Sequence, residues 1–330
     1  MTFPARPATG TPGGTDSADS ADSPGALTTS STPDTTPDTP TPDAVDSLTA
    51  RVLAGAFGPD PAGLRVSVAF TTRQAVRHEG RGTGYRNEVL SLRLAEAVGS
   101  CAVEPGTLHD TAVEECAGAG VAGLLEHPLR PVRVAALDAY LAHVVPHAPD
   151  NGARPFPLPA GTSLERSRTR ARAVVDLLDL APGSRVLVVG VVNSLLEALR
   201  SRGLGYVPCD LKGGSTEWGE PVVTDALASA GRCAALLVSG MTLGNGTFEP
   251  LRRHALRYGK PLVMFAQSGS AVLPRLLGEG VSAVCAEPYP FFWLDGGPGV
   301  LHRYAAPTSN PAGTTGPSTT APTPTPEALR

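Results

Sequence analysis

Arg185-Val-Leu-Val-Val-Gly190 is the stretch that decides the expected fold, because it is a short apolar, β-branched run that ends in glycine. A helical pattern precedes it at 163–180, and another follows it at 193–202. The same unit recurs downstream, with strands expected at 206–209, 234–238, 261–266 and 281–285 and helices at 249–258 and 270–277. Strands that are apolar on both faces and alternate with helices are typical of a buried parallel sheet. The segment 163–306 is therefore expected to be an α/β domain with a doubly wound parallel sheet.

The segment 43–147 shows a different order of elements. Apolar residues three or four apart, such as Val45 and Leu48, predict a helix at its start. Alternation over 65–72 predicts a half-buried strand that leads into the glycine-rich turn 80–84.

The stretch 88–98 fits both periods, and we expect a strand first and a helix after it. From 107 to 147 the pattern is helical. Strands followed by helices predict a smaller α+β domain over 43–147. The Pro-rich piece 148–162 is expected to be the linker between the two domains.

The two ends of the chain differ in composition from the middle. Residues 1–42 consist almost entirely of Thr, Ser, Pro, Asp, Gly and Ala, and residues 307–330 are rich in Thr, Pro, Ser and Gly. Such segments bury too little apolar surface to offset the entropy lost on ordering a chain. Both are therefore expected to be disordered tails.

Several functional classes are not expected from the composition. The chain has no apolar run near the 18–20 residues of a membrane span, and its start does not follow the pattern of a secretory signal. Its five cysteines form no C-x-x-C pair, which argues against a disulfide framework or a structural zinc site and suits the cytoplasm. A net charge of −4 gives no field for nucleic acid. The basic run 166–172 is expected to be a solvated helix face, and a homo-oligomer is left open.

Ligands of a doubly wound sheet bind beyond the carboxyl ends of its strands, and the first such end is Gly190-Val-Val-Asn193. Only the first glycine of a G-x-G-x-x-G motif is present, so bound NAD or FAD is not expected. Asp210 follows the second strand, 20 positions after Gly190, where a ribose-binding carboxylate would lie. It could equally cap a turn.

Two further strand ends are rich in short polar side chains. Thr242, Asn245 and Thr247 follow one strand, together with glycines that permit positive φ. Ser268 and Ser270 follow the next strand in the turn Gln-Ser-Gly-Ser. Adjacent loops of this kind can enclose one anionic or carbonyl group, although an ordinary helix-capping turn has the same composition.

The turn TLGNGT at 242–247 and the run PLVMFAQSGSAVLPRLLGEGVSAVCAE at 261–287 resemble the heavy-metal-chelation family. The family's Rossmann-like domain carries a T-L-x-N-G-T turn and a G-P-S-like turn that line its pocket. Its smaller N-terminal domain is similar to that of enolase, and PVRVAALDAYLA at 131–142 looks like the late helix of that domain. The resemblance covers 48–304 and implies a site between two domains, with a role in heavy-metal chelation or metallophore metabolism. Asp138 departs from the Asn-Ala usual in that helix, and Gln-Ser-Gly-Ser departs from the second turn.

The candidate ligand contacts suit a carboxylated or amino-acid-like molecule, bound free or as a metal chelate. Arg86 could grip a carboxylate with two hydrogen bonds, Asp210 could meet an amine, and Asn87 adds a neutral contact. The candidates for a divalent or transition metal are His78 and Glu88, but no H-x-x-x-H or paired-Cys spacing supports direct metal binding.

Three functions remain open at this point. The first is a protein that binds, and could transform, such a small molecule. The second is an enzyme dependent on S-adenosylmethionine or a nucleotide, using the Gly190 loop and Asp210. The third is an interaction protein with an inactive pocket. No serine lies in a G-x-S-x-G turn, so nucleophilic hydrolysis is not expected, and whether the protein is an enzyme is left open.

Overall fold

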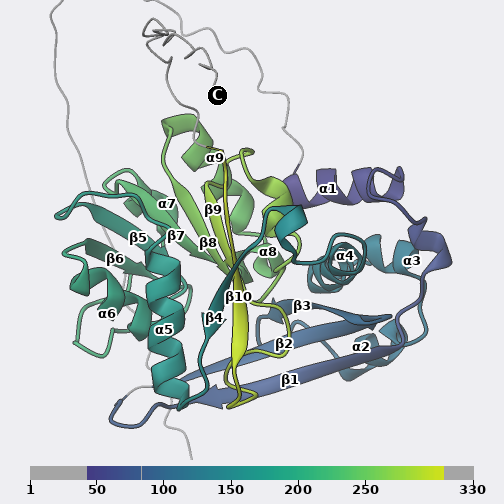
Figure 1. Ribbon diagram of the computed structural model, residues 1–330, viewed down its shortest axis with the longest axis horizontal. Coiled ribbons are helices and arrows are strands. Elements are labelled where there is room, and N and C mark those ends of the chain that lie inside the picture. Colours follow the sequence, from purple (N-terminus) through teal and green to yellow (C-terminus); the bar gives the residue numbers. More distant parts are fainter. Residues whose placement is uncertain (1–42, 83, 308–330) are drawn as a thin grey trace, which may run out of the picture. The chain divides into compact units, whose positions relative to one another are not determined.

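The computed structural model describes residues 43–82 and 84–307, which belong to one compact unit (Figure 1). The expected tails lie outside the described residues. Within these residues the chain is an α/β protein with a small antiparallel sheet and a larger, mostly parallel one. No helix in the described ranges is long and apolar enough to cross a bilayer.

The small sheet has the order β1-β2-β3 and is antiparallel throughout. Its strands and the elements around it are α1 (Ala44–Leu53), η1 (Pro61–Gly63), β1 (Val68–Val76), β2 (Tyr85–Leu94), β3 (Ala97–Val103), α2 (Asp110–Cys116), α3 (Val121–Leu125) and α4 (Arg130–Val144). The prediction of a helix within 88–98 is wrong. Leu90, Leu92 and Leu94 all point into the core at period two, and the chain turns at Ala95 to begin β3. Pairing on both sides of β2 thus decides between two periods that fit the sequence equally well.

The large sheet has the order β4-β10-β9-β8-β7-β5-β6. Its parallel strands are β5 (Arg185–Val189), β6 (Gly205–Cys209), β7 (Ala235–Ser239), β8 (Leu262–Ala266) and β9 (Ala283–Ala286). Helices α5 (Ser163–Val175) and α6 (Asn193–Ser201) share a hydrophobic cluster with one face. Helices α7 (Ala226–Ala230), α8 (Met241–Asn245) and α9 (Phe248–Tyr258) contribute to the cluster on the other face. The doubly wound parallel sheet is confirmed.

A single residue, Val223, extends the parallel part of this sheet beyond β6. Its N–H donates to Pro208 O and its carbonyl accepts from Asp210 N, both at 3.0 Å, in a parallel bridge with Cys209. Numbered in chain order, the parallel segments β5, β6, Val223, β7, β8 and β9 are the first to the sixth. Across the sheet they lie in the order third, second, first, fourth, fifth and sixth. This is the strand order of dinucleotide-binding folds, and its switch point lies between β5 and β7.

Two strands and one short helix differ from the expected elements. The expected linker contains β4 (Arg154–Leu158), which pairs antiparallel with β10 (Gly299–Ala305). Pro155 and Pro157 lack the N–H groups that a central strand needs, so β4 can occupy only an edge of the sheet. The helix expected at 270–277 is a turn followed by the short 3-10 helix η3 (Leu273–Leu276). The boundary between two domains at 148–162 stays a prediction.

The basic run on α5 is not a fully solvated face. Arg166 and Arg170, four positions apart, are 4% and 6% exposed, whereas Arg172 is exposed. Arg166 donates to the carbonyls of Phe292 and Asp295. The four-residue spacing therefore places two of these arginines on the buried side of the helix, where backbone carbonyls accept from Arg166 and the Glu287 carboxylate accepts from Arg170.

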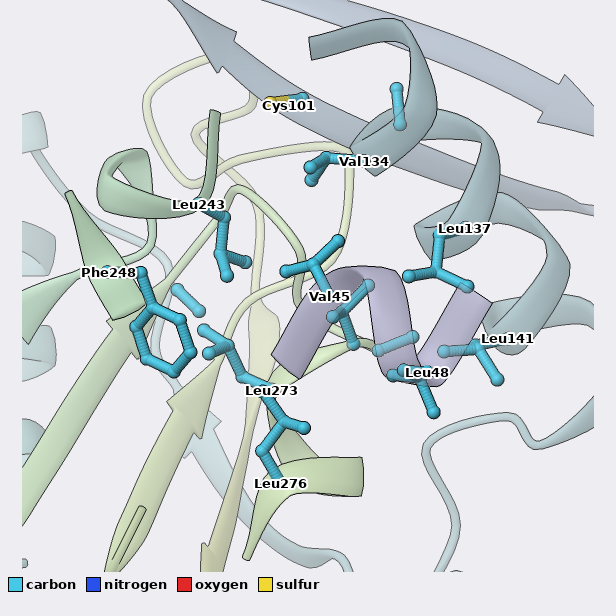
Figure 2. Close-up of a cluster of buried hydrophobic side chains, with 14 of the residues drawn as sticks. Val45, Leu48, Cys101, Val134, Leu137, Leu141, Leu243, Phe248, Leu273 and Leu276 are labelled. Carbon is cyan, nitrogen blue, oxygen red and sulfur yellow. The ribbon is translucent and has the colours of Figure 1, made fainter. Parts of the chain in front are cut away.

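One continuous core joins the small sheet to the large one. Figure 2 shows Val45 and Leu48 of α1 between side chains of α4, among them Leu137, and side chains of α8, α9 and η3, among them Phe248. Helix α8 also lies directly on β3: a Cβ added at Gly244 would come within 2.6 Å of Ala102 O. This close contact requires glycine at that position.

The buried carboxylate of Asp138, on α4, links the two sheets by hydrogen bonds. Its Oδ2 accepts from Ser100 N of β3 at 2.8 Å, and its Oδ1 accepts from Ala271 N, after β8, at 2.7 Å. Next to it, Gly269 N donates to Ser100 O at 2.8 Å. Burial raises the pKa of Asp138 to about 7, although the backbone N–H groups of Ser100, Ala271 and Val272 oppose the rise.

We predict that Asp138→Ala lowers the free energy of unfolding by about 2–5 kcal/mol, because two buried backbone N–H groups lose their acceptor. The measurement is a urea denaturation midpoint at pH 7, with the exposed Asp150→Ala as control. A variant as stable as the control would contradict the role given to Asp138.

The raised pKa of Asp138 also predicts how stability changes with pH. The folded protein binds this proton more tightly than the unfolded chain, so the stabilisation is complete below pH 4 and is lost as pH rises through about 7. The unfolding free energy of the wild type minus that of Asp138→Asn should fall between pH 4 and 7, by up to about 1.4 kcal/mol per pH unit. A difference that grows with pH would show that the carboxyl has a lowered pKa instead.

Candidate ligand-binding site

A cavity of about 610 Å³ lies at the carboxyl ends of β5, β6, β7 and β8. Its other wall comes from the small sheet, chiefly from β2 and the turn between β1 and β2. Valine, leucine and aromatic side chains make up much of the lining, and a few charged groups lie among them. A concave, mostly apolar cavity at the switch point of a parallel sheet is where such folds bind small molecules.

All ligand-binding candidates from the sequence except Ser270 line this cavity: Arg86, Asn87, Gly190, Asn193, Asp210, Thr242, Asn245, Thr247 and Ser268. Ser270 is 2% exposed in the turn after β8 and is not among the lining residues. The ends of four strands of the large sheet and one strand of the small sheet therefore face the same space, although a bound ligand stays a prediction.

Gly190 lies at the switch point and is required there for a structural reason. Its φ is +88°, and an added Cβ would come within 2.7 Å of Ser239 Cβ on β7. The backbone therefore leaves β5 in a conformation that favours glycine, at a distance that admits no side chain. Gly190 N donates to Cys209 O at 2.9 Å, which fixes the turn against β6.

Asp210 both caps a turn and lines the cavity. Its Oδ1 accepts from Lys212 N at 3.0 Å, and its Oδ2 accepts from Val191 N at 3.4 Å. Nearby, Asn193 Oδ1 accepts from Glu217 N at 3.5 Å. The carboxylate is thus held in one orientation by two backbone groups, which is compatible with both expectations for this residue.

The polar groups of the turn after β7 largely satisfy one another. Thr242 Oγ1 donates to Ser239 O at 2.7 Å, and Asn245 Oδ1 accepts from the backbone N and the hydroxyl of Thr247 at 3.1 and 2.7 Å. Asn245 Nδ2 in turn donates to Glu104 Oε1 of the small-sheet region at 3.4 Å. Most of these hydrogen bonds lie within the turn, and neither α8 nor α9 has a side-chain cap at its start, so the turn shapes the cavity wall through internal hydrogen bonds.

Ser268 joins the two sheets. Ser268 is 3% exposed, and its hydroxyl accepts from Ala102 N of β3 at 2.8 Å. The hydroxyl that was expected to contact a ligand therefore also holds β3 beside the end of β8, one residue from the hydrogen bond between Gly269 and Ser100.

Arg81 was not among the residues expected from the sequence. It fastens the turn between β1 and β2 to the large-sheet side of the cavity. Its guanidinium forms ion pairs with Glu217 and, at 2.6 Å, with Glu197 of α6, and its side chain is only 10% exposed. The signal was present in the sequence, since Arg81 is the one long side chain in Gly80-Arg-Gly-Thr-Gly84.

Arg170 was also missed, because its basic run looked solvated. Its Nε donates to Glu287 Oε2 at 2.7 Å, and its guanidinium lies 5.7 Å from the centre of the Phe265 ring. Gln267 Nε2 donates to the same oxygen of Glu287 at 2.7 Å. Arg170, Phe265 and Gln267 all line the cavity, so this buried ion pair forms a fixed part of its wall.

The residues present do not fit a metal held by the protein alone. Glu88 is paired with Arg73 at 3.1 Å and does not line the cavity, whereas His78 lines it and has its Nδ1 3.1 Å from Ser163 Oγ. Burial, and then the charge of Arg81, lower the pKa of His78. Over 43–82 and 84–307 no group of three His, Cys, Asp or Glu side chains is arranged to hold a metal ion.

The sequence matches no protein-family model and no curated protein. Among solved structures, the chain is similar to a DUF364-family protein of unknown function from Desulfitobacterium hafniense, with 15% identity and a TM-score of 0.47 over 73% of this chain and 83% of that one. A DUF364-family protein of unknown function from Pyrococcus horikoshii gives 12% identity and 0.46 over 74% and 86%. A mandelate racemase/muconate lactonizing protein from Herpetosiphon aurantiacus is less similar, with 14% identity and 0.23 over 67% and 73%. None of these likenesses assigns a ligand or an activity.

We predict that Arg81→Ala increases hydrogen exchange of the backbone amides in 77–82, because both ion pairs that fasten this segment are lost. Arg81→Lys should give an intermediate increase, because an ammonium group lacks the planar, forked guanidinium that binds two carboxylates at once. Hydrogen-exchange mass spectrometry measures both, and equal exchange in all three proteins would show that the ion pairs do not hold the segment.

Proposed function

We propose that the protein binds a small carboxylated molecule in this cavity, either amino-acid-derived or metal-chelating, and that it serves in heavy-metal chelation or metallophore metabolism. The observation that carries the proposal is that cationic and anionic side chains from both sheets line one small-molecule-sized space. A further chemical step on the bound molecule would belong to the same site.

Arg86 is the residue best suited to a carboxylate. It lies on β2, is exposed, and lines the cavity. The other two lining arginines already have carboxylate partners, since Arg81 pairs with Glu217 and Arg170 pairs with Glu287. A guanidinium that faces a cavity can bind a carboxylate with two parallel hydrogen bonds.

An amino group on the same ligand has acceptors within the cavity. Asp210 lines it from the large sheet and Glu104 from the small-sheet region, and both carboxylates are already oriented by neighbouring groups. Ligands that carry both an acid and an amine could therefore contact the two walls at once.

A metal would enter this cavity as part of a chelate. The described side chains supply no three-donor cluster, so the ligand's own carboxylates and amines would complete the coordination. The metal is then cargo, and the protein's contribution is to recognise the organic part.

The test is isothermal titration with citrate, L-histidine, and the nickel complex of each. We expect at least one of the four to bind, and Arg86→Ala to weaken that binding by about tenfold or more, as expected for a lost charged hydrogen-bond pair. Arg93→Ala is the matched control, because Arg93 is exposed on the same strand but does not line the cavity.

Two outcomes would contradict the proposal. One is that none of the four probes binds at millimolar concentration. The other is that binding is equal in Arg86→Ala and Arg93→Ala, which would place the ligand elsewhere on the protein.

A further inference from the structure

We infer that the end of the cavity beside Val223, β6 and β5 binds a ribonucleoside that carries an amino group on its base and no phosphate at its 5′ carbon. This inference concerns a different part of the cavity from Arg86. It shares Asp210 with the amine contact proposed above but does not depend on Arg86.

The strand order places two carboxylates at neighbouring strand ends. Asp210 follows β6, and Asp225 lies two positions after Val223, the parallel partner of β6. Both line the cavity, and both are close enough to Cys209 to contribute, after burial, to the rise of its pKa to about 11. In sheets with this strand order, an acid after the second strand receives the hydroxyls of a ribose.

The geometry of Asp210 suits a vicinal diol. Each carboxylate oxygen accepts one backbone hydrogen bond, Oδ1 from Lys212 and Oδ2 from Val191. An ionised carboxylate has about four acceptor positions, so each oxygen can accept one more bond. The 2′ and 3′ hydroxyls of a ribose supply two donors side by side, which matches two oxygens fixed side by side.

The same contact argues against a phosphate. In dinucleotide-binding folds a phosphate lies against the backbone N–H groups after the first strand, where glycines permit close approach. Here Val191 N already donates to a carboxylate, and Val192 and Leu195 stand where the two later glycines of the motif would be. A phosphate at this point would meet the negative charge of Asp210, so a neutral or cationic 5′ group is favoured.

Apolar side chains and one acceptor are present where a base would lie. Leu211 and Leu227 line the cavity although these residues are 56% and 45% exposed. The loop that carries Leu211 and the loop that leads into α7, the helix of Leu227, are adjacent, because a Cβ added at Gly213 would come within 3.3 Å of the Thr224 methyl. A flat base between these loops would cover apolar surface that is otherwise in water.

Asp225 would then select an amino-bearing base. Its Oδ1 accepts from Ala228 N at 3.0 Å and so begins α7, and this bond fixes the carboxylate at the cavity. A carboxylate accepts hydrogen bonds but donates none, so it favours an exocyclic amino group over a carbonyl.

The experiment is a titration series on the wild-type protein with adenosine, 2′-deoxyadenosine, inosine and AMP. Adenosine should bind. The other three should each bind at least about tenfold more weakly, because each loses a charged hydrogen bond or gains a repelled charge. Because the protein itself is unchanged across the series, misfolding cannot produce this pattern. Failure of adenosine to bind at millimolar concentration, or equal binding of adenosine and 2′-deoxyadenosine, would overturn the inference.

Variants then assign the site. Asp210→Asn should weaken adenosine at least tenfold, while the exposed Asp179→Asn should leave it unchanged, with thermal midpoints confirming that both fold. Arg86→Ala should alter adenosine binding less than twofold, which separates this inference from the carboxylate proposal. Adenosine binding that survives Asp210→Asn, or that is lost in Arg86→Ala, would contradict the placement.

Discussion

The hydrogen bonds from the backbone of both sheets to the buried Asp138 carboxylate are the interaction on which the rest of this structure depends. Asp138 is 1% exposed and receives Ser100 N from one sheet and Ala271 N from the other. Ser268 adds a parallel link to Ala102. Because β3 is held in this way beside the end of β8, its neighbour β2 is placed beside the carboxyl ends of the parallel strands. The cavity exists only because that placement is fixed.

Most of the large sheet could be predicted, because a buried parallel strand needs apolar side chains on both faces and that pattern is visible without knowledge of its partners. β4 was missed because Pro155 and Pro157 suggest a linker, and proline is compatible with a strand only at an edge that the sequence does not reveal. The prediction of a helix within 88–98 was wrong for a related reason. Its leucines fit both periods, and only pairing with strands on both sides makes the strand the better solution.

The candidate site was predicted where it depends on topology and missed where it depends on long-range partners. Strand ends of a parallel sheet must meet at one edge, so Gly190, Asp210 and Asn245 could be grouped from their positions alone. That the Ser268 hydroxyl would be occupied by Ala102 N could not be deduced, because this partner comes from a tertiary contact, whereas the partner of Thr242, Ser239, lies three positions away in the same turn. Arg81 and Arg170 were overlooked for the same reason: a buried cation looks like a surface cation until its carboxylate is located.

These hydrogen bonds imply that the two sheets open together, because neither sheet can separate from the other without breaking the bonds to Asp138. Native-state hydrogen exchange measures this most directly, since it reports the free energy of opening for each amide. The amides of Ser100 and Ala102 in β3, and those of Gly269 and Ala271 after β8, should exchange only through global unfolding, with one common free energy equal to that of the whole unit. Exchange of this group at a clearly lower free energy, while central amides of β7 and β8 stay protected, would show that the small sheet detaches by itself and would contradict the account.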